Sequence, residues 1–318
     1  MTTSQAKEKE QALKLESVTW GDLTWTNIEQ PTKRETEYLA KNYPFHQLDL
    51  DDCLSLRQRP KLDVYKDYLF FIFHFTVYSP ETRINTHDQV SVFVGEKYLI
   101  TVHSGKLKPL VKLFRECQIN EEARRENFSY GSGFLLYRVL DRALDRYFPI
   151  LDKILKLTED IEDKVFDENV QAGVEVAILR RDIITQRRVM LPVRTVLVEL
   201  ESKLKRFTKI DLSVQFGDLL DHMNKICETL DVCKEVIEVY KDTDFVLSTD
   251  RLNHIMRVLT VIATIILPFL AISSIYGMNV HMPGSITGGS WVPFMLIILV
   301  MTLIASLMLY FLHRRRWI

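Results

Sequence analysis

The sequence predicts an α+β cytoplasmic domain, followed by long α-helices and a two-helix transmembrane hairpin. Three observations indicate this fold class: a run of aromatic and β-branched residues at 68–78, helical periodicity over 133–249, and no Asp, Glu, Lys or Arg over 258–312. The net charge of −1 indicates no nucleic-acid partner. The chain has no P-loop, HExxH, GxSxG or glycine-rich dinucleotide motif, so we expect no enzyme.

Residues 1–16 are polar and lack the apolar region of a secretory signal, so we expect a mobile N-terminal tail. The four cysteines form no CxxC pair, which indicates no disulfide framework and suits a reducing cytoplasm. Cys227 and Cys233 fall within a helical pattern and are expected to be core thiols.

An α/β domain is expected over residues 17–130. Its strongest element is the strand at 68–78 (YLFFIFHFTVY). Residues 90–94 and 98–102 are predicted as two strands joined by a hairpin turn at Gly95-Glu96-Lys97.

One helix start in this domain has a specific signal. Thr32 is followed three residues later by Glu35, the spacing of a capping box, so we expect a helix from Thr32 to about Tyr43.

A helical hairpin is expected over 131–210, with a second helix that begins at Val174 and breaks or kinks near Pro192. A stalk helix is expected over 211–257. No glycine or proline lies between Gly217 and Pro268, which predicts one helix of about 65 residues running on into the membrane, roughly 100 Å long.

Two apolar runs, 258–276 and 291–312, are each long enough to span a hydrocarbon core of roughly 30 Å. We expect the intervening residues 277–290 to form an extracellular loop, because they hold four glycines and a proline. A buried hairpin of a soluble protein is the alternative, but two such runs are hard to bury in a domain of this size.

Positive charge predicts the orientation. Arg251 and Arg257 precede the first span, the basic tail 313–318 follows the second, and the connecting loop has no Lys or Arg. By the positive-inside rule, we expect a multi-pass protein of the plasma (inner) membrane with both termini cytoplasmic.

Two helices cannot enclose a pore, so a transport function requires an oligomer. The first span carries one stripe of residues at three- and four-residue steps that we interpret as pore-lining. A plain helix–helix contact would give a similar stripe. The stripe consists of Asn253, Met256, Thr260, Ala263, Leu267, Leu270 and Ser274.

Gly277-Met278-Asn279 directly follows the Pro-containing span and precedes a short loop, a second span and a basic-aromatic tail. In this arrangement the sequence resembles the CorA family of magnesium transporters. The resemblance covers nearly all of residues 17–318. Further segments similar to family motifs are 44–54, 59–62 with Tyr65 and 68–70, 216–222 and 257–266.

The resemblance implies a funnel-shaped homopentamer in the lipid bilayer, with a channel for Mg²⁺ and also for Co²⁺ or Ni²⁺. Gly277, Met278 and Asn279 would form its outer selectivity filter. Oxygens of a ring of Asn279 side chains would hold the hydrated cation loosely enough for conduction. An acid that the family commonly has after Met-Pro is absent after Met282-Pro283, which predicts weaker capture of cations.

The resemblance also implies regulation by intracellular Mg²⁺ bound between cytoplasmic domains, with Asp218 as one ligand. Asp218, Asp221 and His222 are spaced to share a helix face. The usual acidic partner of this position falls at Ser79, with Glu81 the nearest substitute, which puts conventional feedback gating in question.

Two alternatives stay open. A Zn²⁺ transporter of the same architecture is favoured only by His281 in the outer loop, while Met278 counts against it. A membrane-anchored scaffold without transport would need no Asn279.

Overall fold

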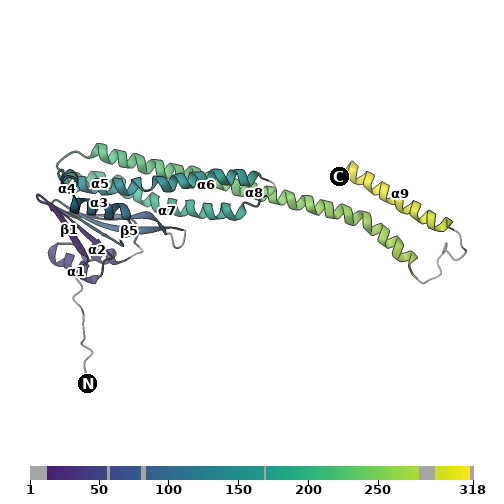
Figure 1. The fold of residues 1–318 in the computed structure, drawn as a ribbon, viewed down its shortest axis with the longest axis horizontal. Helices are drawn as coiled ribbons and strands as arrows, with labels where there is room; N and C mark the ends of the chain where they lie inside the picture. The colour runs from purple at the N-terminus through teal and green to yellow at the C-terminus, as the bar shows by residue number, and fades with distance from the viewer. Residues whose placement is uncertain (1–12, 56–57, 80–83, 168–169, 279–290, 316–318) are drawn as a thin grey trace, which may run out of the picture. The chain divides into compact units, whose positions relative to one another are not determined.

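The computed structural model forms two compact units, Met1–Lys241 and Asp242–Ile318 (Figure 1). The structure describes residues 13–55, 58–79, 84–167, 170–278 and 291–315.

The first unit is built on a six-stranded mixed sheet with the order β1-β2-β6-β5-β4-β3. The β2/β6 pair is parallel and the other four pairs are antiparallel. The three strands predicted at 68–78, 90–94 and 98–102 are confirmed as β4, β5 and β6, which are neighbours in the sheet. The strands are β1 Leu15–Trp20, β2 Leu23–Glu29, β3 Lys61–Val64, β4 Tyr68–Ser79, β5 Ile84–Gly95 and β6 Tyr98–His103.

The sheet is buried on both faces, which explains why β4 has no polar alternation. Leu69, Phe71 and Phe73 point into one core, and Phe70 and Ile72 point into the other, all with no exposed side-chain surface. Successive side chains of a strand face opposite sides, so a strand covered on both sides needs an unbroken apolar run.

Helices α1 (Lys33–Asn42) and α2 (Gln47–Leu54) cover one face (Figure 1). The predicted capping box is confirmed, because the Thr32 hydroxyl accepts from the Arg34 amide and Glu35 Oε2 accepts from the Thr32 amide at 2.8 Å. Beneath these helices, the rings of Phe45 and Phe93 stack at 4.1 Å between centroids.

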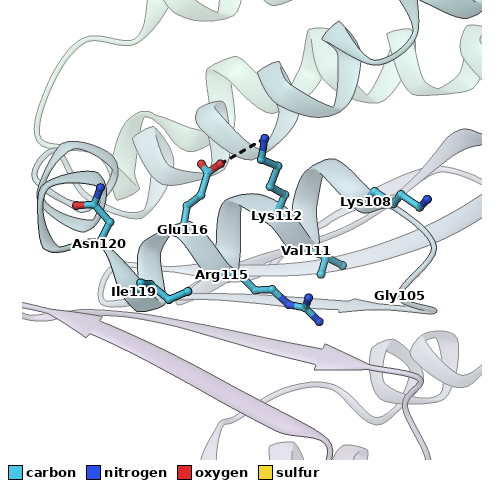
Figure 2. Close-up of a pocket in the computed structure, with 8 residues that line it drawn as sticks. All are labelled: Gly105, Lys108, Val111, Lys112, Arg115, Glu116, Ile119 and Asn120. Atoms are coloured by element: carbon cyan, nitrogen blue, oxygen red, sulfur yellow. Dashed lines mark ion pairs between the residues drawn. The ribbon is translucent and has the colours of Figure 1, made fainter.

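Helices α3 (Lys108–Ile119) and α4 (Glu121–Phe128) belong to the core on the other face, where Phe114 meets the edge of the Trp25 ring at 5.0 Å. Figure 2 shows the outer flank of α3, which is hollowed over about 560 Å³. The cysteines are free and buried, as expected for Cys227 and Cys233.

Three longer helices and the first part of a fourth complete the first unit. The sequence predicted a break or kink near Pro192; a break is wrong, because the helix α7 runs through Pro192 without interruption, and the kink stays a prediction. The Pro192 nitrogen has no hydrogen to donate to the carbonyl of Arg188. Arg188 is exposed, so water can take the place of the missing donor, and packing of α7 on β4 keeps the helix continuous. These helices are α5 Ser132–Asp145, α6 Phe148–Phe166, α7 Gly173–Leu204 and α8 Ser213–Tyr276.

Three arginines of α7 bind α8 at matched seven-residue intervals, and we call these pairs the arginine ladder. Arg180 donates to Glu238 at 2.6 Å, Arg187 donates to Asp231, and Arg194 donates to Asn224 at 2.6 Å. A seven-residue step returns nearly to the same helix face, so all three pairs fall along one seam.

The second unit holds the end of α8 and α9 (Val292–Arg314). The predicted helix from near Asp211 into the apolar run is confirmed, because α8 is one helix of 64 residues. Both helices are long and apolar enough to cross a membrane, with mean hydropathy 2.5 and 2.7 over their most apolar windows.

Candidate metal-ion sites

The end of α8 is closed by backbone hydrogen bonds that lead into the Gly-Met-Asn segment. The Gly277 amide donates to the Ser273 carbonyl at 2.9 Å, and the Met278 amide donates to Ile275 at 3.3 Å. A Cβ on residue 277 would lie 3.1 Å from the Ser273 carbonyl oxygen, a close contact. Asn279 lies outside the described residues, and so does His281.

The half-buried residues of the second unit indicate which face of α8 and which face of α9 lie toward the other helix. The half-buried positions of α8 recur at three- and four-residue steps, and those of α9 do the same. We infer that these two stripes face each other in the hairpin. They comprise Val261, Thr264, Ile265, Pro268, Phe269 and Ile272 on α8, and Ile297, Met301, Ile304, Ala305, Met308 and Leu312 on α9.

The predicted pore-lining stripe lies on the opposite side of α8. Each of its seven residues, from Asn253 to Ser274, is exposed in the single chain. At about 100° per residue, its mean direction falls roughly 150° from the half-buried stripe. A surface that lines a pore or contacts another subunit has to be free of contacts within its own chain, and this stripe meets that condition.

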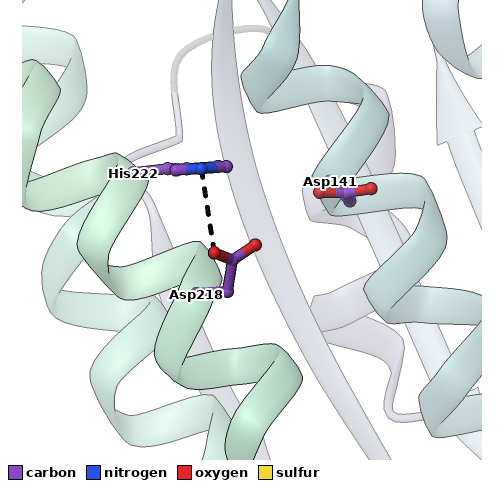
Figure 3. Close-up of side chains that lie close together, drawn as sticks. All are labelled: Asp141, Asp218 and His222. Atoms are coloured by element: carbon purple, nitrogen blue, oxygen red, sulfur yellow. Dashed lines mark ion pairs between the residues drawn. The ribbon is translucent and has the colours of Figure 1, made fainter.

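A second candidate site lies in the first unit, where three potential ligands converge (Figure 3). Oxygen atoms of Asp141 and Asp218 and a ring nitrogen of His222 all lie within 4.8 Å of one another. Asp218 and His222 are one turn apart on α8, with Oδ1 and Nε2 separated by 3.9 Å, and Asp141 reaches them from α5.

The electrostatics of this cluster favour a bound cation. Burial raises the pKa of Asp141, and repulsion from Asp145 and Asp218 raises it further, against the opposing charges of Arg138 and His222. A divalent cation would cancel this repulsion and stabilise the ionised carboxylates.

His222 is held in position by packing. Its ring meets the edge of Phe148 at 5.4 Å, and its Nδ1 atom is buried without a hydrogen-bond partner among the described residues. An imidazole beside two carboxylates is a ligand set that suits Co²⁺, Ni²⁺ or Zn²⁺ as well as a hydrated Mg²⁺.

Asp218, the one ligand of this site that the resemblance implied, lies in this cluster together with His222. Asp221, which was expected on the same helix face, is exposed and is not among the described residues that converge here, whereas Asp141 was not predicted. Glu81 and the Ser79 side chain lie outside what the structure describes. Asp141 precedes Asp218 by 77 positions, so no local spacing signals the contact.

Comparison with known proteins gives a consistent result. Residues 20–315 match the family described as CorA-like Mg²⁺ transporter protein. The YfjQ protein of Bacillus subtilis is 31% identical over 80% of this chain and 78% of its own length. The cobalt/magnesium transport protein CorA of Thermotoga maritima is 26% identical over 93% of this chain and 83% of its own length.

The fold comparison agrees. The CorA magnesium transporter structure from Methanocaldococcus jannaschii matches with a TM-score of 0.75 and 24% identity, covering 95% of this chain and 94% of that one.

An α/β domain, a long helix and a membrane hairpin therefore define a divalent metal ion transporter of the membrane, not an enzyme. The chain belongs to the CorA-like Mg²⁺ transporter family.

Proposed function

We propose that this protein is a channel-type transporter that takes up Mg²⁺, and also Co²⁺ or Ni²⁺, across the plasma membrane. The observation that carries the proposal is the exposed stripe of α8, which faces away from α9 and leads to Gly277 at the end of the helix. The membrane potential drives entry with about 2.3 kcal/mol per charge per 100 mV.

In this proposal, a homopentamer surrounds the pore with one copy of α8 from each subunit. The stripe is polar at Asn253 and Thr260 and apolar at Met256 and Leu267, which suits an ion pathway with hydrophobic constrictions. Gly277, Met278 and Asn279 form the outer filter, where amide oxygens bind the hydrated cation. Residues 17–257 and the basic tail then lie in the cytoplasm.

The cluster of Asp141, Asp218 and His222 is the proposed intracellular cation site. Its two carboxylates come from α5 and α8, so a bound ion joins the stalk helix to the cytoplasmic domain. Losing the ion restores the repulsion between the carboxylates of Asp141 and Asp218, which loosens this connection. Cation occupancy of the site would thus control how tightly the stalk helix α8 is held to the cytoplasmic domain.

Flux from purified protein tests the function. Proteoliposomes with an inside-negative potential should take up Mg²⁺, with Co²⁺ or Ni²⁺ as competitors. A Zn²⁺ transporter is the second candidate, because the zinc transport protein ZntB of Klebsiella pneumoniae is 24% identical over 71% of this chain. Uptake of Zn²⁺ that excess Mg²⁺ fails to inhibit would favour it, and absence of flux for every divalent would refute both.

The intracellular site gives a second prediction. Without divalent cations at pH 7, Asp141→Asn should raise the melting temperature slightly. In wild type, the raised pKa of Asp141 means that its ionised carboxylate lowers the free energy of unfolding above that pKa. This destabilisation disappears as the pH falls. In wild type, Mg²⁺ at about 100 times its dissociation constant should add about 2.7 kcal/mol, or about 5–10 °C. The variant should lose at least half of this increment.

Asp152→Asn is the matched control, because Asp152 is an exposed acid of α6 outside the cluster. It should keep the full increment in differential scanning fluorimetry. An increment in Asp141→Asn equal to that of wild type would show that this cluster binds no regulatory cation.

A further inference from the structure

A cavity of about 360 Å³ lies in the first unit, and none of its lining residues belongs to the metal-ion cluster. It is bounded by the end of β4, the segment entering α3, the start of α6 and one residue of α7. Its volume falls within the range of small-molecule sites, and its walls come from segments far apart in the sequence. The fold therefore builds this cavity, rather than any single helix.

Positive charge is concentrated around the cavity. Lys106 and Lys108 lie at the entry to α3, Arg146 lies between α5 and α6, and Lys153 lies in α6, whereas Asp182 is the one carboxylate among the described lining residues. Among the described residues, no ion pair joins Lys106, Lys108 or Arg146 to an acid. Cations gathered in this way repel each other unless an anion lies between them.

The first turns of α3 and α6 add to this field. Both helices begin at the cavity, and neither has a side-chain cap at its N-terminus. Helix N-termini carry partial positive charge, so they favour the same negatively charged ligand.

Apart from Thr76, the rest of the lining is apolar. Leu107 and Ile154 are buried, and Pro149, Ile150 and Leu157 also line the cavity. A site for inorganic phosphate alone would need no such wall. The combination fits a ligand with several negative charges at one end and an apolar ring system at the other.

We propose that this cavity binds a nucleoside polyphosphate, with the phosphates between Lys106, Lys108 and Arg146 and the base against the apolar wall. The hollow on the flank of α3 in Figure 2 is different in kind. Its residues belong to α3 and the loops at its two ends, and Ile119 is 87% exposed there. It supplies a control, because Arg115 is an exposed arginine in that hollow but not in the cavity.

Binding of ATP to the full-length protein in detergent, measured by equilibrium dialysis in EDTA, tests the proposal. We expect one saturable site per chain, with adenosine and pyrophosphate each binding at least about tenfold more weakly. Arg146→Ala and Lys106→Ala should each weaken ATP binding about tenfold, as expected for loss of a charge-assisted contact. Arg146→Lys should retain most of the affinity, and Arg115→Ala should have no effect.

Absence of saturable ATP binding would overturn the proposal, and so would equal weakening by Arg115→Ala, which would indicate non-specific attraction. Pyrophosphate binding as tightly as ATP would exclude the nucleoside. Circular dichroism and size-exclusion elution of each variant separate loss of binding from loss of fold. The measurement involves no transport, so its failure leaves the proposed cation uptake intact.

Discussion

Alanine at position 279 is expected to abolish Mg²⁺ uptake, reducing flux in proteoliposomes by at least about 100-fold. In the proposed pore, the amide oxygen of Asn279 accepts hydrogen bonds from the water shell of the incoming hydrated cation, and a methyl group has no oxygen to offer. Every subunit of a homopentamer carries the change, so the whole ring of acceptors disappears at once. A fluorescent Mg²⁺ indicator inside the vesicles measures the effect.

Asn42→Ala is the control for this experiment, since Asn42 is an exposed residue at the end of α1, far from the membrane spans in sequence. Its flux should equal that of wild type. Asn279→Ala with wild-type flux would remove the filter assignment, whereas loss of flux in both variants would point to damaged reconstitution.

Phe93→Ala is expected to destabilise the first unit by about 3–5 kcal/mol, the usual cost of removing a buried aromatic ring. Phe93 has no exposed surface, and its ring contacts Phe45 at 4.1 Å and Phe70 at 4.6 Å in the core beneath α1 and α2. At about 2–4 °C per kcal/mol, the melting temperature should fall by about 10 °C.

Phe166→Ala makes the same change at the end of α6, where the side chain is 60% exposed. It should alter the melting temperature by less than about 2 °C. Equal shifts in the two variants would contradict the assignment of Phe93 to a packed core.

The sequence predicted several elements from strong local signals, and one usable local signal was missed. The run at 68–78 and the capping box at Thr32 and Glu35 were confirmed as β4 and the start of α1. Strands β1 and β2 were not predicted. They meet at Gly21-Asp22, a two-residue turn in which Gly21 has φ +59°, and this Gly-Asp pair between Thr- and Trp-rich runs was a usable signal.

The site was predicted only where its members lie close in sequence. Asp218 and His222 share a helix face by their spacing, which periodicity detects. Asp141 joins them only because α5 packs near α8, a tertiary contact with no periodic signature. The apparent break at Pro192 failed for the same reason, since packing of α7 decided the outcome over local helix propensity.

The arginine ladder restricts the kinds of motion open to α8. Sliding α8 along α7 by one to six residues would separate Arg180, Arg187 and Arg194 from their partners at the same time. A seven-residue slide, about 10.5 Å, would re-form only two of the three pairs. Rocking or twisting about the seam requires no such rupture, because long arginine side chains can follow a small change of angle. We therefore expect the stalk to transmit a change of tilt, rather than a piston stroke, toward the membrane.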